Sequence, residues 1–296
     1  MMEIMCLAVA PLSGINNERI RLKEIDEMKA DFHMHTSFST DSDSAPEQMI
    51  EGAIARGLHT ICITDHQDVD FPEHITPSGF RLDFETYFQT LRELQERYKN
   101  RIEVLIGVEF GLQPHLGKIY KELAQKYPFD FIIGSVHIFD GMDPYYKEYF
   151  KDKTDEEGYE RAFQITLKNI KNISDYDVLG HLDYVVRYGN HQARDYSYGR
   201  YADYIDEILR YLIEHGKGLE VNTAGFKYGL DFAHPHPDIL KRYKELGGEI
   251  ITIGADGHKP EHIAYDFHKI SAILQECGFK NYTEFRQRKP FFRQLP

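Results

Sequence analysis

From residue 28 onward, short apolar runs alternate with amphipathic helical stretches, and this alternation limits the folds that the chain can adopt. The runs have the length and composition of buried strands and lie at residues 31–36, 60–66, 102–110, 129–137, 176–180, 218–223 and 249–258. The helical stretches lie at residues 44–57, with Ser44 as the expected N-cap, and at 83–98, 116–126, 160–173, 201–215 and 260–276. Such alternation predicts a parallel sheet, and seven or eight strand–helix units close most simply into a barrel. We therefore predict an α/β barrel.

The length of the chain fits one domain of this kind. At 296 residues it lies in the range of single α/β barrels, and no repeat, low-complexity tract or linker divides it. We assign residues 28–296 to this domain. Residues 1–27 are expected to form an N-terminal extension, because their apolar patch is short and lacks the preceding basic segment of a secretory signal.

Composition excludes several functional classes. No run approaches the roughly 18 consecutive apolar residues of a membrane span, so a membrane protein is not expected. The formal net charge of -13 argues against nucleic acid as a partner, because phosphate backbones are bound by clustered basic residues. The cysteines, Cys6, Cys62 and Cys277, have neither disulfide nor metal-site spacing, which fits a reducing cytoplasm best. The sequence leaves the oligomeric state open.

The apolar runs share a chemical feature, because all except the one at 218–223 end in His, Glu or Asp. In the first run, His33 and His35 are two residues apart, which in an extended strand puts both imidazoles on one face. In an α/β barrel the carboxyl ends of the strands surround one site, so these side chains are expected to converge. The candidate ligands are His33, His35, Asp41, His66, Glu109, His137, His181, Asp256 and His258.

This set of side chains favours a metal centre. Six imidazoles and three carboxylates exceed the needs of one four-coordinate ion, so they predict two or three divalent ions that share a carboxylate. Such nitrogen and oxygen ligands suit zinc, manganese or iron. Any one of these histidines alone would more often be a core or surface group with a local hydrogen bond. Their repetition at successive strand ends is what favours the metal site.

Two basic residues in later loops are candidates for binding an anionic substrate. A guanidinium binds phosphate oxygens in a bidentate manner, which makes Arg187 the first candidate and Lys227 the second. The alternative for each is an ordinary surface salt bridge. The chain has no Ser/His/Asp motif, Walker loop or Gly-rich dinucleotide fingerprint. Metal-assisted hydrolysis needs none of these motifs.

Taken together, the motifs resemble those of the polymerase and histidinol phosphatase (PHP) superfamily. They are His33-Met34-His35 with Asp41, Thr64-Asp65-His66, Gly107-Val108-Glu109, Ser135-Val136-His137, Gly180-His181-Leu182-Asp183 and Asp256-Gly257-His258. The resemblance covers residues 28–276 and includes every candidate ligand position. Two longer stretches, Gly-His-Leu-Asp-Tyr-Val-Val-Arg-Tyr-Gly from residue 180 and Glu-Val-Asn-Thr-Ala-Gly from residue 220, resemble the histidinol-phosphate phosphatase branch.

The resemblance implies a distorted (β/α)7 TIM-like barrel with three divalent metal ions at the C-terminal ends of its strands. The three implied ligand sets are His33, His35, Glu109 and Asp256; Glu109, His137 and His181; and Asp41, His66 and His258. Asp256 would also pass a proton to the leaving oxygen. Asp256, through this proton transfer, and Arg187, through binding of the phosphate oxygens, are the predicted catalytic residues.

Several other polar residues are candidates for contacts around the site. Asp68, Glu73 and Asp183 are expected either to bind the substrate beyond its phosphate or to orient a metal-bound histidine. His234 and His236 are each followed by proline, which is more typical of turn chemistry than of a ligand pair. The remaining histidines are expected to be structural or solvated.

Three hypotheses about function follow. The first is a metal-dependent phosphomonoesterase that hydrolyses L-histidinol phosphate in histidine biosynthesis. The second is a PHP phosphoesterase for another small substrate, such as a nucleotide, a sugar phosphate or a protein phosphotyrosine. The third is a non-catalytic metal-binding or proofreading-like module of a larger assembly, and the complete ligand set counts against it.

Overall fold

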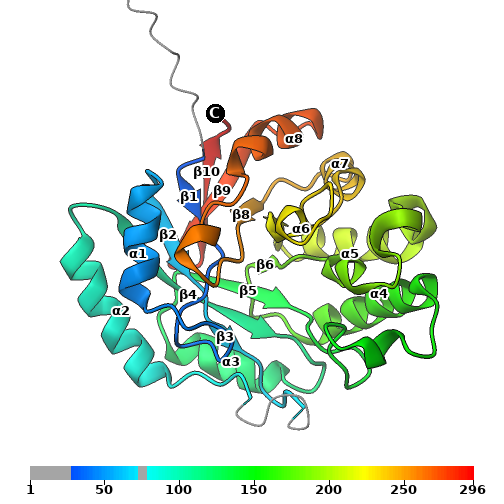
Figure 1. Ribbon diagram of the computed structural model, residues 1–296, viewed down its shortest axis with the longest axis horizontal. Helices are drawn as coiled ribbons and strands as arrows, with labels where there is room; N and C mark the ends of the chain where they lie inside the picture. The colour runs from blue at the N-terminus through cyan, green and yellow to red at the C-terminus, as the bar shows by residue number, and fades with distance from the viewer. Residues whose placement is uncertain (1–27, 73–78) are drawn as a thin grey trace, which may run out of the picture.

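The computed structural model describes residues 28–72 and 79–296 (Figure 1). The predicted extension at 1–27 and the candidate Glu73 lie outside these residues. A parallel sheet forms the centre of the molecule. Its strands, in order across the sheet, are β1 (Ala30–Asp31), β2 (Thr60–Ile63), β4 (Glu103–Gly111), β5 (Phe131–Ser135), β6 (Val178–Leu179), β7 (Gly218–Asn222) and β8 (Ile251–Gly254). A further short strand, β3 (His66–Gln67), pairs with β4 beyond the end of β2.

The sheet curves into a nearly closed barrel. Every pairing along it is parallel. β8 returns beside the first strand, where the Phe32 amide donates to the Ile253 carbonyl at 3.0 Å and Met34 forms a parallel bridge with Gly257. The predicted α/β barrel is confirmed. Its distortion is visible in β1 and β6, each of which has only 2 residues.

Helices cover the outside of the barrel (Figure 1). The longer ones are α1 (Pro46–Ala55), α2 (Phe84–Tyr98), α3 (Gly117–Lys126), α4 (Asp155–Asn172), α5 (Ala202–Glu214), α7 (Pro237–Glu245) and α8 (Ile270–Glu276). Local capping explains where several of them begin. Asp83 caps α2 by accepting from the Thr86 amide, and Thr154 and Glu157 form a capping box at the start of α4.

Two helices differ from the expectation, one in its N-cap and one in being present at all. α1 begins after Ala45 rather than after Ser44, because the Ser44 hydroxyl donates to the His258 carbonyl at 3.0 Å and is not available as a cap. α7 has no counterpart among the expected helices. The His236 ring accepts from the Asp238 amide at its start, so this histidine acts as the N-cap.

The helix expected at 260–276 forms only in its last part, so that prediction is wrong for the first half. The Ala264 amide donates to the buried Asp31 carboxylate at 2.9 Å rather than to a helical carbonyl, and both Ala264 and Asp266 have left-handed backbone conformations. The chain therefore passes through two short 3-10 helices, η5 (Pro260–His262) and η6 (Phe267–Lys269), before α8 begins.

The tail after α8 folds into an antiparallel hairpin of β9 (Asn281–Arg286) and β10 (Lys289–Gln294), another element absent from the expected set. The hairpin lies against the N-terminal ends of the barrel strands. Arg288 in its turn donates to Asp177, and the Phe285 ring packs on Phe131 with centroids 5.0 Å apart. The end of the barrel opposite the carboxyl strand ends is thus covered by the chain itself.

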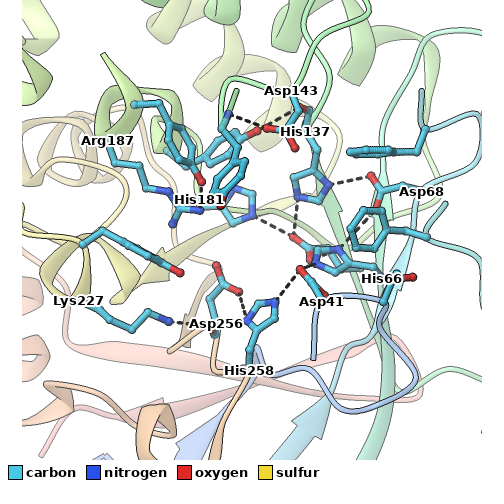
Figure 2. A pocket seen from close by; sticks show the side chains of 18 of the residues that line it. Asp41, His66, Asp68, His137, Asp143, His181, Arg187, Lys227, Asp256 and His258 are labelled. Atoms are coloured by element: carbon cyan, nitrogen blue, oxygen red, sulfur yellow. Dashed lines mark hydrogen bonds and ion pairs between the residues drawn. The ribbon is translucent and has the colours of Figure 1, made fainter. Parts of the chain in front are cut away.

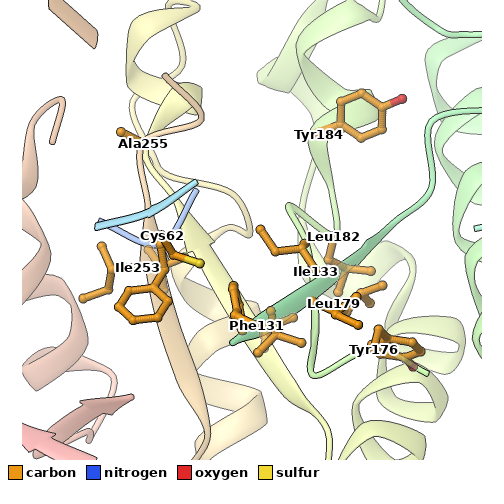
Figure 3. Close-up of a cluster of buried hydrophobic side chains, with 14 of the residues drawn as sticks. Cys62, Phe131, Ile133, Tyr176, Leu179, Leu182, Tyr184, Ile253 and Ala255 are labelled. Carbon is orange, nitrogen blue, oxygen red and sulfur yellow. The ribbon is translucent and has the colours of Figure 1, made fainter. Parts of the chain in front are cut away.

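Buried apolar side chains pack on both faces of the barrel sheet (Figure 3). Cys62 and Phe131 are fully buried and lie on the same face of the sheet as Glu109, the face that lines the barrel interior. Leu179 and Ile253 are at most 1% exposed and lie on the opposite face. The Phe131 ring also meets the Phe32 ring edge to face, with centroids 5.5 Å apart. This packed layer provides a rigid floor for the polar side chains at the strand ends. Within residues 28–72 and 79–296, no helix is long and apolar enough to cross a membrane.

Candidate metal centre

The carboxyl ends of the barrel strands open into a pocket of about 680 Å³ (Figure 2). Most of the predicted metal ligands form its wall, namely Asp41, His66, Glu109, His137, His181, Asp256 and His258. His33 and His35 lie beneath them and are fully buried. The parallel topology therefore brings together side chains that are up to 225 residues apart in the sequence, from His33 to His258.

Glu109 is the residue on which the cluster converges. Its side chain is fully buried near the end of β4. Oε1 lies 3.0 Å from Nε2 of His181 and 3.3 Å from Nε2 of His137. Oε2 lies 3.2 Å from Nε2 of His33 and 3.5 Å from Nε2 of His35. One carboxylate thus faces imidazoles from three separate strand ends.

His66 adds the observation that points most directly to a metal. Its Nδ1 lies 3.0 Å from Oε2 of Glu109, yet neither atom has a hydrogen-bond partner among the described residues. Buried polar atoms are seldom left unpaired. Two atoms that bind a common ion would be placed in this way, because ligands about 2.1 Å from zinc lie about 3.4 Å apart at a tetrahedral angle. The residues present therefore fit divalent cations.

Asp256, His258 and Asp41 form the opposite wall. Oδ1 of Asp256 lies 3.3 Å from Nε2 of His35 and 3.6 Å from Nδ1 of His258. Oδ2 of Asp41 lies 3.1 Å from Nε2 of His258 and 3.6 Å from Nε2 of His66. Asp256 has a φ of 51°, so the chain turns sharply out of β8 at this point. All of the predicted ligands consequently meet in one place.

Two buried carboxylates orient candidate metal-ligand histidines by accepting from the ring nitrogen that points away from Glu109. Asp68 accepts from Nδ1 of His137 at 2.8 Å, and Glu220 accepts from Nδ1 of His33 at 2.6 Å. Such bonds fix the orientation and the tautomer of an imidazole and leave Nε2 as the ligand atom. In both histidines Nε2 is the atom that faces Glu109.

Glycines make room for these two carboxylates. A Cβ atom on Gly111 would lie 1.7 Å from Oδ1 of Asp68, and a Cβ atom on Gly254 would lie 2.6 Å from Oε1 of Glu220. Neither position can therefore carry a side chain while the carboxylate keeps its place. The two glycines are part of the architecture of the centre, although they contribute no ligand atom.

Sequence reasoning missed Glu220 and Asp65. Glu220 stands in the middle of an apolar strand, and a buried charge in that setting is the signal that could have identified it. Its Oε2 also accepts from the His181 amide at 2.8 Å. Asp65 accepts from the Thr36 amide at 2.6 Å and from the Ser39 hydroxyl at 2.6 Å, and so joins the loop after β1 to the end of β2.

The electrostatics of the cluster favour bound cations. Although burial opposes it, the charges of the surrounding imidazoles hold the pKa of Glu109 well below its ordinary value. Burial also opposes protonation of His137, but the Asp68 and Glu109 carboxylates raise its pKa to about 10. Burial lowers the pKa of His35 to about 3, which keeps this ring neutral, as a metal ligand must be. The carboxylates are thus held ionised, and bound cations would replace the protons that the neighbouring imidazoles carry.

Arg187 and Lys227 lie on the pocket wall near Asp256 (Figure 2). Arg187 belongs to the 3-10 helix η2 (Tyr184–Tyr188), and its guanidinium carbon lies 4.2 Å from the ring centroid of Tyr228. The guanidinium donates to the Tyr188 hydroxyl rather than to a carboxylate. Nζ of Lys227 donates to the Asp256 carbonyl at 3.0 Å. Both cations therefore face the pocket, as expected for groups that bind an anion.

The acidic residues considered for the substrate have different surroundings. Asp68 lines the pocket, but one of its oxygens is engaged by His137. Asp183 is fully buried and is not among the described residues that line the pocket, because its oxygens accept from His234, His236 and Tyr196. The prediction that Asp183 contacts the substrate is therefore corrected.

The PHP domain family, as represented by its sequence model, matches residues 31–224 of the chain. The chain belongs to the PHP family. Two longer stretches resemble the histidinol-phosphate phosphatase branch. The matched segment contains the stretch from residue 180 in full and the stretch from residue 220 except for its last residue, Gly225. The family assignment agrees with the barrel and with the ligand geometry at its carboxyl end.

Full-length relatives of this PHP protein are similar to it over most of their length. The histidinol-phosphatase of Lactococcus lactis subsp. lactis is 33% identical over 262 residues, which covers 88% of this chain and 96% of that protein. A probable histidinol-phosphatase of Clostridium acetobutylicum is 33% identical over 253 residues, or 86% and 95% of the two chains. The crystal structure of the L. lactis histidinol phosphate phosphatase, complexed with zinc, L-histidinol and phosphate, is similar with a TM-score of 0.80 and 33% identity, covering 89% of this chain and 98% of that chain.

Proposed function

We propose that this PHP protein is a metal-dependent phosphomonoesterase that hydrolyses L-histidinol phosphate to L-histidinol and phosphate, a reaction of histidine biosynthesis. The observation that carries the proposal is the convergence of the histidine and carboxylate cluster on one pocket whose wall also holds Arg187 and Lys227. The choice of substrate is supported by the likeness to the L. lactis enzyme, whose structure contains L-histidinol and phosphate.

We infer that the centre binds three divalent ions, of zinc, manganese or iron. Two groups of side chains share Glu109 and have ligand atoms within 4.8 Å of one another, namely His33, His35 and Glu109, and Glu109, His137 and His181. They support two ions bridged by that carboxylate. A third ion is supported by Asp41, whose Oδ2 lies 3.1 Å from His258 and 3.6 Å from His66.

The pocket residues supply what hydrolysis of a phosphate monoester requires. The dianion repels nucleophiles, which makes the uncatalysed reaction very slow. Divalent ions bound here would neutralise the dianion and lower the pKa of water toward neutrality. Arg187 would bind two phosphate oxygens with its planar fork, and Lys227 would add a second positive charge. Asp256, which borders both the histidine cluster and the pocket, would take the proton that the attacking water gives up and pass it to the leaving oxygen.

The mouth of the pocket suits a flat, cationic leaving group. Its aromatic lining consists of five tyrosines and two phenylalanines, namely Tyr145, Tyr146, Tyr184, Tyr188, Tyr228, Phe71 and Phe80. The Asp143 carboxylate also lines the pocket, and burial raises its pKa. A positively charged substrate ammonium beside it would lower this pKa again and stabilise the ionised carboxylate. An imidazole would stack on the tyrosine faces. Histidinol combines these two groups, so the lining favours L-histidinol phosphate over esters without a positive charge.

Measured turnover of a panel of phosphate esters tests this proposal. The purified protein, loaded with manganese or with zinc, would be assayed for phosphate release from L-histidinol phosphate, a sugar phosphate, a nucleotide and a phosphotyrosyl peptide. The expected result is a kcat/KM for L-histidinol phosphate well above the others. A preference for another ester would assign the second hypothesis, and metal binding without any turnover would assign the third.

A further inference from the structure

We propose that Asp183 and His234 are positioning residues that hold the Arg187 guanidinium in the orientation in which it binds the phosphate group. The inference deepens the proposed function, on which it rests through the role of Arg187. Neither Asp183 nor His234 lines the pocket, as far as the described residues show, so any effect on the substrate must pass through another side chain.

Asp183 joins the segment that carries Arg187 to a distant part of the chain. It immediately precedes η2, yet its side chain does not cap that helix. Oδ1 accepts from Nδ1 of His234 at 2.7 Å. Oδ2 accepts from the His236 amide and from the Tyr196 hydroxyl, both at 2.9 Å. Three donors therefore fix a fully buried carboxylate and tie the start of η2 to residues 234–236.

His234 is held firmly on its other side. Its amide donates to the Asn222 carbonyl at 2.8 Å and its carbonyl accepts from the Asn222 amide at 2.7 Å, which anchors it to the end of β7. The ring is fully buried. Because burial lowers the pKa of His234, the ring is neutral, and Nδ1 carries the proton that is donated to Asp183. Nε2 is then available as an acceptor.

His234 and Arg187 each carry one buried side-chain nitrogen whose hydrogen-bonding capacity is left over. Nε2 of His234 and Nε of Arg187 are both buried, and both lack a hydrogen-bond partner among the described residues. The positive charge of Arg187 also lowers the pKa of the His234 ring. One water that donates to Nε2 of His234 and accepts from Nε of Arg187 would satisfy both atoms.

Such a bond would complete the positioning of the guanidinium. The rings of Tyr228 and Tyr188, with centroids 4.2 Å and 4.7 Å from the guanidinium carbon, restrict the plane of the group. Within that plane one terminal nitrogen is held by the Tyr188 hydroxyl. A second bond at Nε of Arg187 would prevent rotation about this single contact and leave the remaining N–H groups for the phosphate oxygens.

A double-mutant cycle on phosphate affinity tests the proposal. The dissociation constant of inorganic phosphate would be measured by calorimetry on the metal-loaded protein, with metal content and melting temperature recorded for each variant. His234→Ala is expected to weaken phosphate binding roughly tenfold, as the loss of a hydrogen bond to a charged group does. In the Arg187→Ala background the same change is expected to have less than about a twofold effect. Equal factors in the two backgrounds, or no effect of Arg187→Ala itself, would overturn the proposal.

Two further variants and a control separate positioning from general stability. Asp183→Asn is expected to reproduce the loss, because the asparagine amide would donate to Nδ1 of His234 and leave Nε2 protonated toward the guanidinium. His234→Gln is expected to restore part of the affinity, because its side-chain oxygen is an acceptor near the position of Nε2. The matched control is Tyr196→Phe, which removes another donor to Asp183 but keeps the pair with His234. It is expected to lower the melting temperature without changing phosphate affinity.

The outcome of these measurements does not depend on the identity of the ester. Inorganic phosphate is the probe, so failure of L-histidinol phosphate as a substrate would leave the cycle informative. A Tyr196→Phe variant that loses phosphate affinity as strongly as His234→Ala would mean that the cluster acts on stability alone, and it would refute the positioning role.

Discussion

The two ends of the barrel both hold buried or partly buried carboxylates, but only the C-terminal end leaves carboxylate oxygens unpaired among the described residues. At the N-terminal end, Asp130 accepts from two backbone amides, and Asp177 accepts from a backbone amide and from Arg288. At the C-terminal end, Oε2 of Glu109 lies 3.0 Å to 3.5 Å from imidazole nitrogens and has no hydrogen-bond partner among the described residues. The first end is complete as the chain folds it, whereas at the second the proposed cations would meet the unpaired oxygen of Glu109.

This difference distinguishes structural from functional burial of charge. An unsatisfied buried polar atom costs about 1–3 kcal/mol, so a cluster of them is retained only where the surrounding fold is stable enough to hold it. The apolar interior and the C-terminal hairpin, with Phe285 packed on Phe131, supply that stability at the other end. Substitutions at the two ends should therefore separate activity from stability.

The largest effect is expected for His137→Ala at the C-terminal end. The variant loses a ligand that faces Glu109, and we expect it to bind fewer metal ions and to lose more than about 1,000-fold in kcat/KM, because a metal contributes several kcal/mol to such reactions. Phosphate release and metal analysis measure both effects. His268→Ala, at a side chain that is 59% exposed, is the matched control. A His137→Ala variant with full metal content and normal turnover would contradict the assignment of the centre.

Arg187→Ala should have the second largest effect. Loss of charge-assisted hydrogen bonds to the phosphate, worth about 1.5–3 kcal/mol, corresponds to a roughly 10- to 150-fold loss of kcat/KM, with metal content unchanged. Inhibition by inorganic phosphate should weaken in parallel. Arg97→Ala, which removes an arginine paired with Glu47 on the surface, serves as the control. Unchanged phosphate inhibition in Arg187→Ala would show that the guanidinium does not contact the phosphate.

Glu220→Gln sharpens the comparison within the centre. The change removes the charge that orients His33 while keeping the size of the side chain, so we expect metal affinity to fall about 10- to 100-fold. Excess metal should restore most of the activity. Titration with a competing chelator measures the affinity, and Glu249→Gln, at a side chain that is 66% exposed, provides the reference. Wild-type affinity in Glu220→Gln would mean that the carboxylate has no orienting role.

Arg288→Ala, at the N-terminal end, should affect stability alone. The substitution removes a donor to the buried Asp177 carboxylate, and we expect the free energy of unfolding to fall by about 1–3 kcal/mol while kcat/KM and metal content stay as they are. Denaturant unfolding and the ester assay measure these quantities in the same samples. Loss of activity in the folded Arg288→Ala variant would show that the two ends are coupled.

The sequence was sufficient to predict the fold class and to identify the residues that gather at the carboxyl strand ends. Each of these residues follows or ends an apolar run, and a parallel barrel brings all such ends to one side. The hairpin, α7 and the interrupted helix before α8 were not predictable in this way. Their conformations depend on partners that are distant in the sequence, such as the Asp31 carboxylate that takes the Ala264 amide.

The sequence by itself determined which side chains can bind metal and on which edge of the sheet they lie, because strand periodicity and parallel topology are local and repetitive properties. Only the tertiary structure decided which carboxylates orient the histidines and which do not line the pocket. Glu220 and Asp183 illustrate this. Glu220 meets His33 across 187 positions and Asp183 meets His234 across 51. The role of a buried charge is set by the donors that the folded chain places around it, and those donors come from other segments.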